Sequence, residues 1–146
     1  MTTKEKRILV VDDDDAIRAL LFTVLRRKSF AVDVARDGAA ALERLARCSY
    51  SVVLLDLMMP RMNGWEVLDT LAGRPRETRP LVIVLTAGTE PRTFPPDLVA
   101  GTIRKPFDVD LIVDMVSACL TTLRDLEQLD SCPDADSRGT RAEKTN

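Results

Sequence analysis

The sequence contains no histidine. This absence excludes Ser-His and Cys-His nucleophilic pairs and histidine-based metal sites, so any reaction must rely on carboxylates, hydroxyls and lysines. Cysteine is scarce as well: Cys48, Cys119 and Cys132 are far apart and include no close pair of the kind found in zinc sites and redox motifs. We interpret them as inert thiols of a protein in the reducing cytoplasm.

The sequence also lacks long apolar runs and a strong excess of charge. Ile8–Val11 is too short for the core of a signal peptide, and Leu81–Leu85 is far below the roughly 18 residues that cross a bilayer. The 21 basic and 23 acidic side chains give a net charge of -2, which argues against affinity for nucleic-acid phosphates. We therefore predict no membrane insertion and no direct nucleic-acid binding.

A chain of 146 residues with 45% apolar residues has the size and composition of one domain with its own hydrophobic core. We place that domain at residues 6–129 and interpret the polar segment 130–146 as a disordered tail. The roughly 22 residues after Arg124 are too few for a DNA-binding or catalytic effector domain. The sequence therefore predicts a protein that acts through a partner and is not itself an enzyme with a separate catalytic domain.

Short apolar runs alternate with segments of helical periodicity. Strands are predicted at 8–11, 30–34, 52–55, 81–85 and 101–104, and helices at about 17–29, 37–46, 65–72 and 112–129. Between Gly88 and Gly101, Pro91, Pro95 and Pro96 predict a short helix or a loop, because proline disrupts helical hydrogen bonding. The alternation predicts an α/β fold whose parallel sheet is covered by helices on both faces.

Polar residues follow four of the predicted strands. They are Asp12 and Asp13, Asp56, Thr86 and Lys105. Because the carboxyl ends of parallel strands share one edge of the sheet, where ligands bind in such folds, these side chains are expected to converge there.

The run Asp12–Asp15 has two interpretations when taken alone. Aspartates satisfy free amide groups at a helix N-terminus, but clustered carboxylates also favour a cation. Asp56 favours the second interpretation, since it ends a neighbouring buried strand. Mg²⁺ suits such a site because it prefers oxygen ligands and is held by one or two carboxylates together with phosphate oxygens. Lys105 and Thr86 are suited to a phosphoryl group, although each has an ordinary explanation as a surface or strand-end residue.

Four ordered motifs resemble the response-regulator receiver domain of two-component signalling. They are residues 8–13, the segment 53–64 (VLLDLMMPRMNG), the Leu85–Ala87 step and Lys105–Phe107, and the similarity covers about residues 6–124. The resemblance implies a flavodoxin-like, doubly wound five-stranded parallel sheet of strand order 2-1-3-4-5. It also implies a histidine in the phosphoryl donor, either a sensor histidine kinase or a phosphotransfer protein.

The same resemblance assigns roles to single residues. Asp56 would be the phosphoacceptor, and Asp12, Asp13, Asp56 and the backbone carbonyl of Met58 would bind Mg²⁺. Lys105 would pair with the acyl phosphate, Thr86 would move to bind it, and the Lys105–Pro106 bond would be cis. Phosphorylation would then change the affinity for a downstream protein partner.

Three features depart from the family pattern. Thr102 replaces the usual aromatic residue of the switch, and the proline-rich segment 88–101 predicts a short or irregular fourth helix and an atypical output surface. Met58 and Gly88 stand where side chains influence dephosphorylation in the family, and neither side chain can orient a water molecule. We therefore predict a long-lived acyl phosphate.

The last predicted helix also fits part of a heptad seam, but most of its apolar stripe must cover the sheet. Leu126 and Leu129 lie beyond residues 6–124, the part that the resemblance covers, and would there support a homodimer.

Two other functions compete with the receiver interpretation. A phosphatase of the haloacid dehalogenase type is suggested by Asp12 and Asp14, but it leaves Asp56 without a role. A receiver-like interaction module that no longer switches is suggested by Thr102 and the prolines.

Overall fold

The computed structural model of the protein describes residues 7–57, 59, 63–88 and 94–130. Its strands are β1 (Arg7–Val11), β2 (Ala31–Ala35), β3 (Val52–Asp56), β4 (Leu81–Thr86) and β5 (Val99–Arg104). These strands form one parallel sheet of order β2-β1-β3-β4-β5, as predicted. The fold is therefore the flavodoxin-like doubly wound α/β fold that the sequence indicated.

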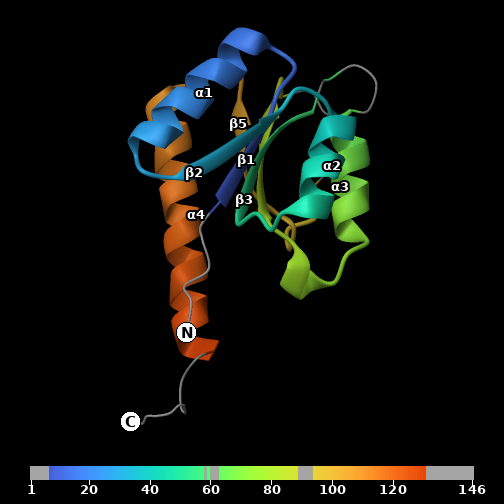
Figure 1. Ribbon diagram of the computed structural model, residues 1–146, viewed down its shortest axis with the longest axis vertical. Helices are drawn as coiled ribbons and strands as arrows, with labels where there is room; N and C mark the ends of the chain where they lie inside the picture. Colours follow the sequence, from blue (N-terminus) through green and yellow to red (C-terminus); the bar gives the residue numbers. More distant parts are fainter. Residues whose placement is uncertain (1–6, 58, 60–62, 89–93, 131–146) are drawn as a thin grey trace.

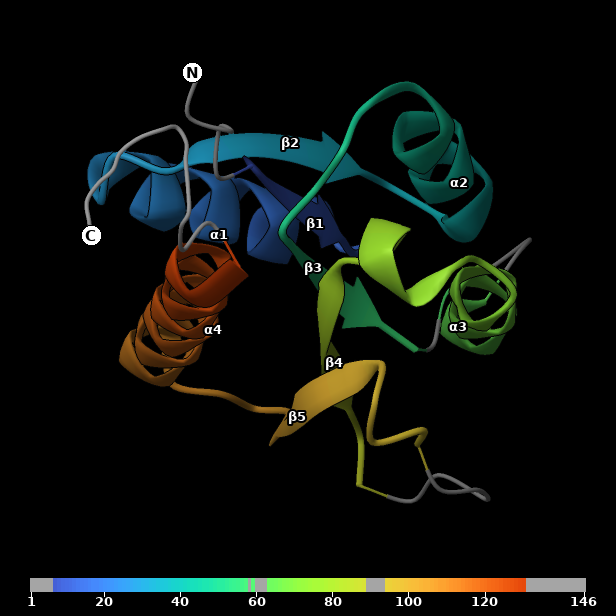
Figure 2. The same cartoon turned by 90° about the horizontal axis from the view of Figure 1, so that it is seen from below.

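Helices cover both faces of this sheet. The α-helices are α1 (Asp15–Arg27), α2 (Gly38–Arg47), α3 (Gly64–Ala72) and α4 (Val109–Asp130), and a short 3₁₀ helix, η1 (Arg76–Thr78), precedes β4. Helices α1 and α4 lie on one face, and α2 and α3 lie on the other (Figures 1 and 2). Figure 1 also shows the last turns of α4 extending past the end of the sheet.

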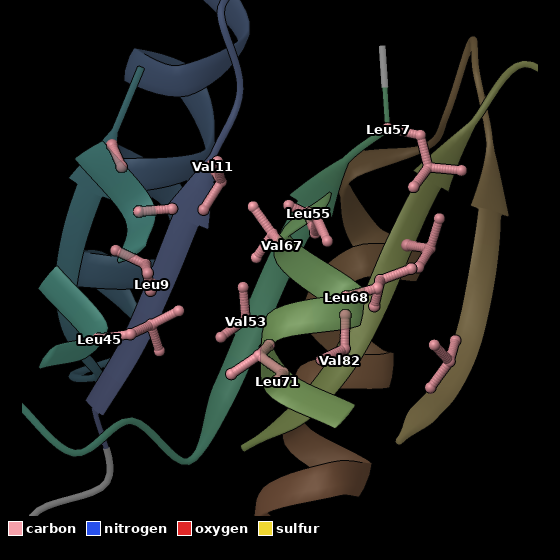
Figure 3. Close-up of a cluster of buried hydrophobic side chains, with 14 of the residues drawn as sticks. Leu9, Val11, Leu45, Val53, Leu55, Leu57, Val67, Leu68, Leu71 and Val82 are labelled. Carbon is pink, nitrogen blue, oxygen red and sulfur yellow. The ribbon is translucent and has the colours of Figure 1, made fainter. Parts of the chain in front are cut away.

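Alternation along the strands builds the two layers of the core. In β1, Leu9 and Val11 point toward α2 and α3, whereas Ile8 and Val10 point toward α1 and α4. Figure 3 shows the first layer, in which side chains of β1, β3 and β4 meet Val67, Leu68 and Leu71 of α3. All five residues of β3 are buried, because this central strand has helices on both sides.

The connection between β4 and β5 is the segment for which the prolines predicted a short helix or a loop. The described residues of this connection, 87–88 and 94–98, form no helix, and a turn at 96–98 leads directly into β5. The amides of Leu98 and Val99 both donate to the carbonyl of Pro95. Strand β5 begins at Val99, two residues earlier than predicted, and a register irregularity next to Val82 accommodates the extra length.

None of the helices in the described ranges is long and apolar enough to cross a membrane. Of the predicted tail, 130–146, only Asp130 is among the described residues, and it is the last residue of α4.

Candidate functional site

The carboxyl edge of the sheet brings the predicted residues together. Asp12 follows β1, Asp56 ends β3, Thr86 ends β4 and Lys105 follows β5. Parallel pairing places Val11 beside Leu55, so the two aspartates that follow these residues emerge next to each other. The Lys105 amide donates to the Thr86 carbonyl over 2.8 Å, which extends the β4–β5 ladder by one bond and fixes the start of the lysine side chain.

Two buried carboxylates share one ammonium group. The Asp12 and Asp56 side chains are 0% and 5% exposed, and Lys105 Nζ lies 3.4 Å from Oδ2 of each. Burial alone would lower the pKa of Lys105 and is the largest single influence on it, but the charges of Asp12 and Asp56 together outweigh it and raise the pKa. Lys105 is therefore a firmly charged cation between two acids that would otherwise repel each other.

The four aspartates Asp12–Asp15 differ in their positions, and the structure separates those that cap a helix from those that lie in the carboxylate cluster. Asp12 and Asp13 belong to the site, and Asp12 Oδ1 accepts a 2.9 Å hydrogen bond from the Asp14 amide. Asp14 is the N-cap of α1 and accepts from the amides of Ala16 and Ile17. Asp15 lies in the first turn and pairs with Arg18. The helix-capping interpretation is thus confirmed for Asp14 and Asp15, whereas Asp12 and Asp13 are left available for a cation.

Asp12, Asp13 and Asp56 together fit a divalent cation. One carboxylate oxygen from each residue lies within 4.8 Å of the others, and Asp13 is exposed while the other two are buried. Three oxygen donors with an open, solvent-facing side match the preference of Mg²⁺, which keeps several of its waters. The predicted further ligand, the carbonyl of Met58, lies outside the described residues.

Thr86 is buried beside this cluster and its hydroxyl oxygen already has a partner. Thr86 Oγ1 accepts a 2.9 Å hydrogen bond from the Gly88 amide. Gly88 has a φ of +88°, and a Cβ atom at this position would lie 2.7 Å from Arg104 Cζ. Arg104 therefore occupies the space in which a side chain at position 88 would stand. On the same strand Thr102 is exposed, so the position of the usual aromatic residue contributes no buried group.

Gly64 supports the backbone that carries Asp56. A Cβ atom at Gly64 would lie 2.6 Å from Leu57 Cα and 2.7 Å from the Asp56 carbonyl oxygen. The Gly64 amide donates to the Leu57 carbonyl over 3.0 Å, and Asn63 caps α3 in a reciprocal capping box with Glu66. The start of α3 is thus fixed against the residue that follows Asp56.

Sequence reasoning missed Arg18 and Arg104 at this edge of the sheet. Arg18 Nη1 donates to the Asp12 carbonyl over 2.9 Å, and the position of Arg18 one turn into α1 is the one signal that would have indicated the contact. Nothing in the local pattern marks Arg104. The implied cis bond between Lys105 and Pro106 is confirmed.

Comparison with known proteins gives a consistent result. A family model described as a response regulator receiver domain matches residues 8–117. The transcriptional regulatory protein ResD of Bacillus subtilis is 40% identical over 121 residues, which are 81% of this chain and 49% of ResD. The chain thus spans 49% of the length of ResD and 24% of the regulatory protein AtoC of Escherichia coli, to which it is 39% identical over 74% of its own length.

Solved structures agree with this match. The CheY-like receiver domain protein of Methanospirillum hungatei has a TM-score of 0.73 and 27% identity, over 84% of this chain and 99% of that one. Response regulator TrrA of Thermotoga maritima, solved in complex with Mg²⁺ and BeF, has a TM-score of 0.68 and 31% identity, over 78% of this chain and 98% of that one.

Proposed function

Because this chain belongs to the response regulator receiver domain family of two-component systems, we propose that Asp56 accepts a phosphoryl group in a Mg²⁺-dependent reaction. The phosphoryl donor is a phosphohistidine of a sensor histidine kinase or of a phosphotransfer protein. The observation that carries the proposal is the position of Lys105 Nζ, 3.4 Å from both Asp12 and Asp56 in a cluster that also contains Asp13.

Apart from the Asp56 nucleophile itself, the reaction requires mainly positioning of the phosphoryl group and neutralisation of its charge. An Asp56 carboxylate oxygen forms a bond to phosphorus while the bond from phosphorus to the donor imidazole breaks, and the imidazole leaves with a proton from solvent. Mg²⁺ bound by Asp12, Asp13 and Asp56 would neutralise charge on the phosphoryl oxygens. Lys105 is already charged and lies beside the nucleophile, so it pairs with the new anion without a large rearrangement.

The acyl phosphate changes what Thr86 can bind. The Thr86 hydroxyl, whose oxygen accepts from the Gly88 amide in the unphosphorylated protein, would turn and donate to a phosphoryl oxygen. That movement releases Gly88, which packs against Arg104, and so transmits the change to the surface of β5. The output is a change in affinity for a downstream protein partner, limited by the difference in binding free energy between the two states. Thr102 supplies no aromatic ring to this switch.

The test is phosphorylation by a small donor. Purified protein incubated with acetyl phosphate and Mg²⁺ should gain the mass of one phosphoryl group, whereas the Asp56→Asn variant should gain none. Asp108→Asn, an exposed acid outside the cluster, is the control for loss of one negative charge. Absence of the mass gain in the wild type, or a gain that persists in Asp56→Asn, would overturn the proposal.

The phosphatase alternative loses its support at Asp14. The Asp14 carboxylate accepts from two amides of the first turn of α1, so it serves the helix and is not positioned as a general acid. The alternative of a receiver-like module that does not switch is supported by the exposed Thr102. Under this alternative, phosphorylation would leave the NMR spectra of β5 residues unchanged.

We further propose a long-lived acyl phosphate and a cytoplasmic regulator whose domain covers residues 6–129. Gly88 offers no side chain that could hold an attacking water, and Arg104 fills its place. Loss of phosphate from the purified phosphoprotein should take minutes or longer; a lifetime of seconds would contradict this.

We also propose that the end of α4 supports a homodimer. Gel filtration of a chain truncated after Leu123 tests this, since an unchanged oligomeric state would exclude a role for the end of α4.

A further inference from the structure

Four arginines surround a surface pocket that the phosphoacceptor site does not use. The pocket has a volume of about 430 Å³ and lies beside the carboxyl end of β2, between α1 and α2. Arg18 comes from α1, Arg36 follows β2, and Arg44 and Arg47 lie one turn apart on α2. Three separate segments therefore bring positive charge to one concave surface.

Most of this charge is not neutralised within the protein. Over the described ranges, Arg36, Arg44 and Arg47 form no ion pair with a carboxylate, and Glu43, the single acid lining the pocket, pairs with none of them. All three arginines are exposed. Like charges gathered around a pocket repel one another, so an anion of several charges would be attracted to it. The net charge of the whole chain is -2, so this basic surface is local and does not reflect an overall basic protein.

We propose that this pocket binds a small polyphosphate, the group shared by inorganic tripolyphosphate and nucleoside triphosphates. Guanidinium groups bind phosphate oxygens through paired N–H donors, and a chain of phosphates offers one anionic group to each arginine around the wall. The volume lies in the range of small-ligand sites, roughly 300–1,000 Å³. A concave site of this size favours a compact ligand over a flat macromolecular surface.

Arg18 connects the pocket to the site of the three aspartates. Its side chain is 18% exposed, donates to the Asp12 carbonyl and pairs with Asp15, while it also lines the pocket. Because Arg18 is already engaged, Arg36, Arg44 and Arg47 are the principal ligand-binding groups. Arg18 would nevertheless contact both the bound polyphosphate and the backbone carbonyl of Asp12.

Isothermal titration of the full chain with sodium tripolyphosphate, in low-salt buffer without Mg²⁺, tests the proposal. We expect one binding site per chain. The affinity for tripolyphosphate should fall about tenfold or more in the double variant Arg44→Gln/Arg47→Gln, and it should also fall in Arg36→Gln. Arg27→Gln, an exposed arginine at the end of α1 outside the pocket, should change the affinity by less than about twofold. Comparison of tripolyphosphate with ATP distinguishes a site for a phosphate chain from one that also recognises a nucleoside.

Absence of binding would overturn the proposal, as would an equal loss of affinity in Arg27→Gln, which would indicate attraction to general surface charge. The substituted arginines are exposed, and circular dichroism of each variant verifies the fold. Asp56→Asn should bind tripolyphosphate as the wild type does, so failure of the pocket and failure of the phosphoacceptor are separate results.

Discussion

At the scale of single residues, Gly64 determines how closely α3 approaches the backbone of Asp56. Alanine at this position would place a methyl group 2.6 Å from Leu57 Cα, and backbone atoms cannot move aside as a flexible side chain can. We expect Gly64→Ala to lower the free energy of unfolding by about 1–3 kcal/mol and to slow phosphorylation of Asp56. Gly73→Ala is the matched control, because its nearest neighbour would lie at 3.5 Å and its backbone is helical. Urea denaturation measures the stability of the two variants, and equal values would contradict the steric argument.

Tyr50 gives the protein a specific sensitivity to alkaline pH. Burial, followed by the 2.6 Å hydrogen bond from its hydroxyl to Asp33, raises the pKa of this tyrosine. Below about pH 10 the folded and unfolded states both keep the proton, so the contribution of this group to stability is complete. Above that pH the unfolded state ionises first, and stability falls by at most about 1.4 kcal/mol per pH unit.

Tyr50 is the single tyrosine in the chain, so Tyr50→Phe removes this effect alone. Urea denaturation at pH 9 and pH 11 should show a smaller loss of stability in the variant than in the wild type. The variant is less stable at pH 9, because Asp33 then keeps only its pairing with Arg7. Identical losses in the two proteins would exclude the proposed role of Tyr50.

At the scale of elements, the connection between β4 and β5 compensates in part for the helix that its described residues lack. Phe94 stacks on Trp65 at the start of α3, with ring centroids 5.0 Å apart and an angle of 10° between the planes. We expect Phe94→Ala to cost about 1–2 kcal/mol and to shift the emission of Trp65, the single tryptophan, to longer wavelength. Phe22→Ala, on the opposite face of the sheet, should leave that emission unchanged. An unshifted spectrum in Phe94→Ala would show that the stack is absent in solution.

At the scale of the whole molecule, the proposed Mg²⁺ site at the carboxyl edge of the sheet would couple metal binding to stability. If Mg²⁺ binds to the folded state only, a concentration one hundred times its Kd stabilises the protein by about 2.7 kcal/mol. Asp13→Asn should abolish most of this gain. Without Mg²⁺ the same variant should be as stable as the wild type or slightly more so, because one of three neighbouring negative charges is removed.

Asp114→Asn, an exposed acid on α4, is the control of equal charge for this experiment. Thermal unfolding with and without Mg²⁺ measures all three proteins. A Mg²⁺-dependent increase in Tm that survives in Asp13→Asn would assign the metal to another place.

The order of the elements along the chain and the residues at the edge of the sheet could be read from the sequence, because short strand patterns alternate with helical periodicity and polar residues stand at or just after the ends of four strands. Such signals involve only a few neighbouring positions, as in the step from β3 to Asp56. The tertiary structure decided the contacts that depend on register and on the packing of distant segments. Lys105 reaches Asp12 across 93 positions of the sequence, Arg104 fills the space beside Gly88, and four arginines meet at one pocket. No local periodicity specifies which of these side chains meet, because the sheet and its covering helices place them only after the whole domain has folded.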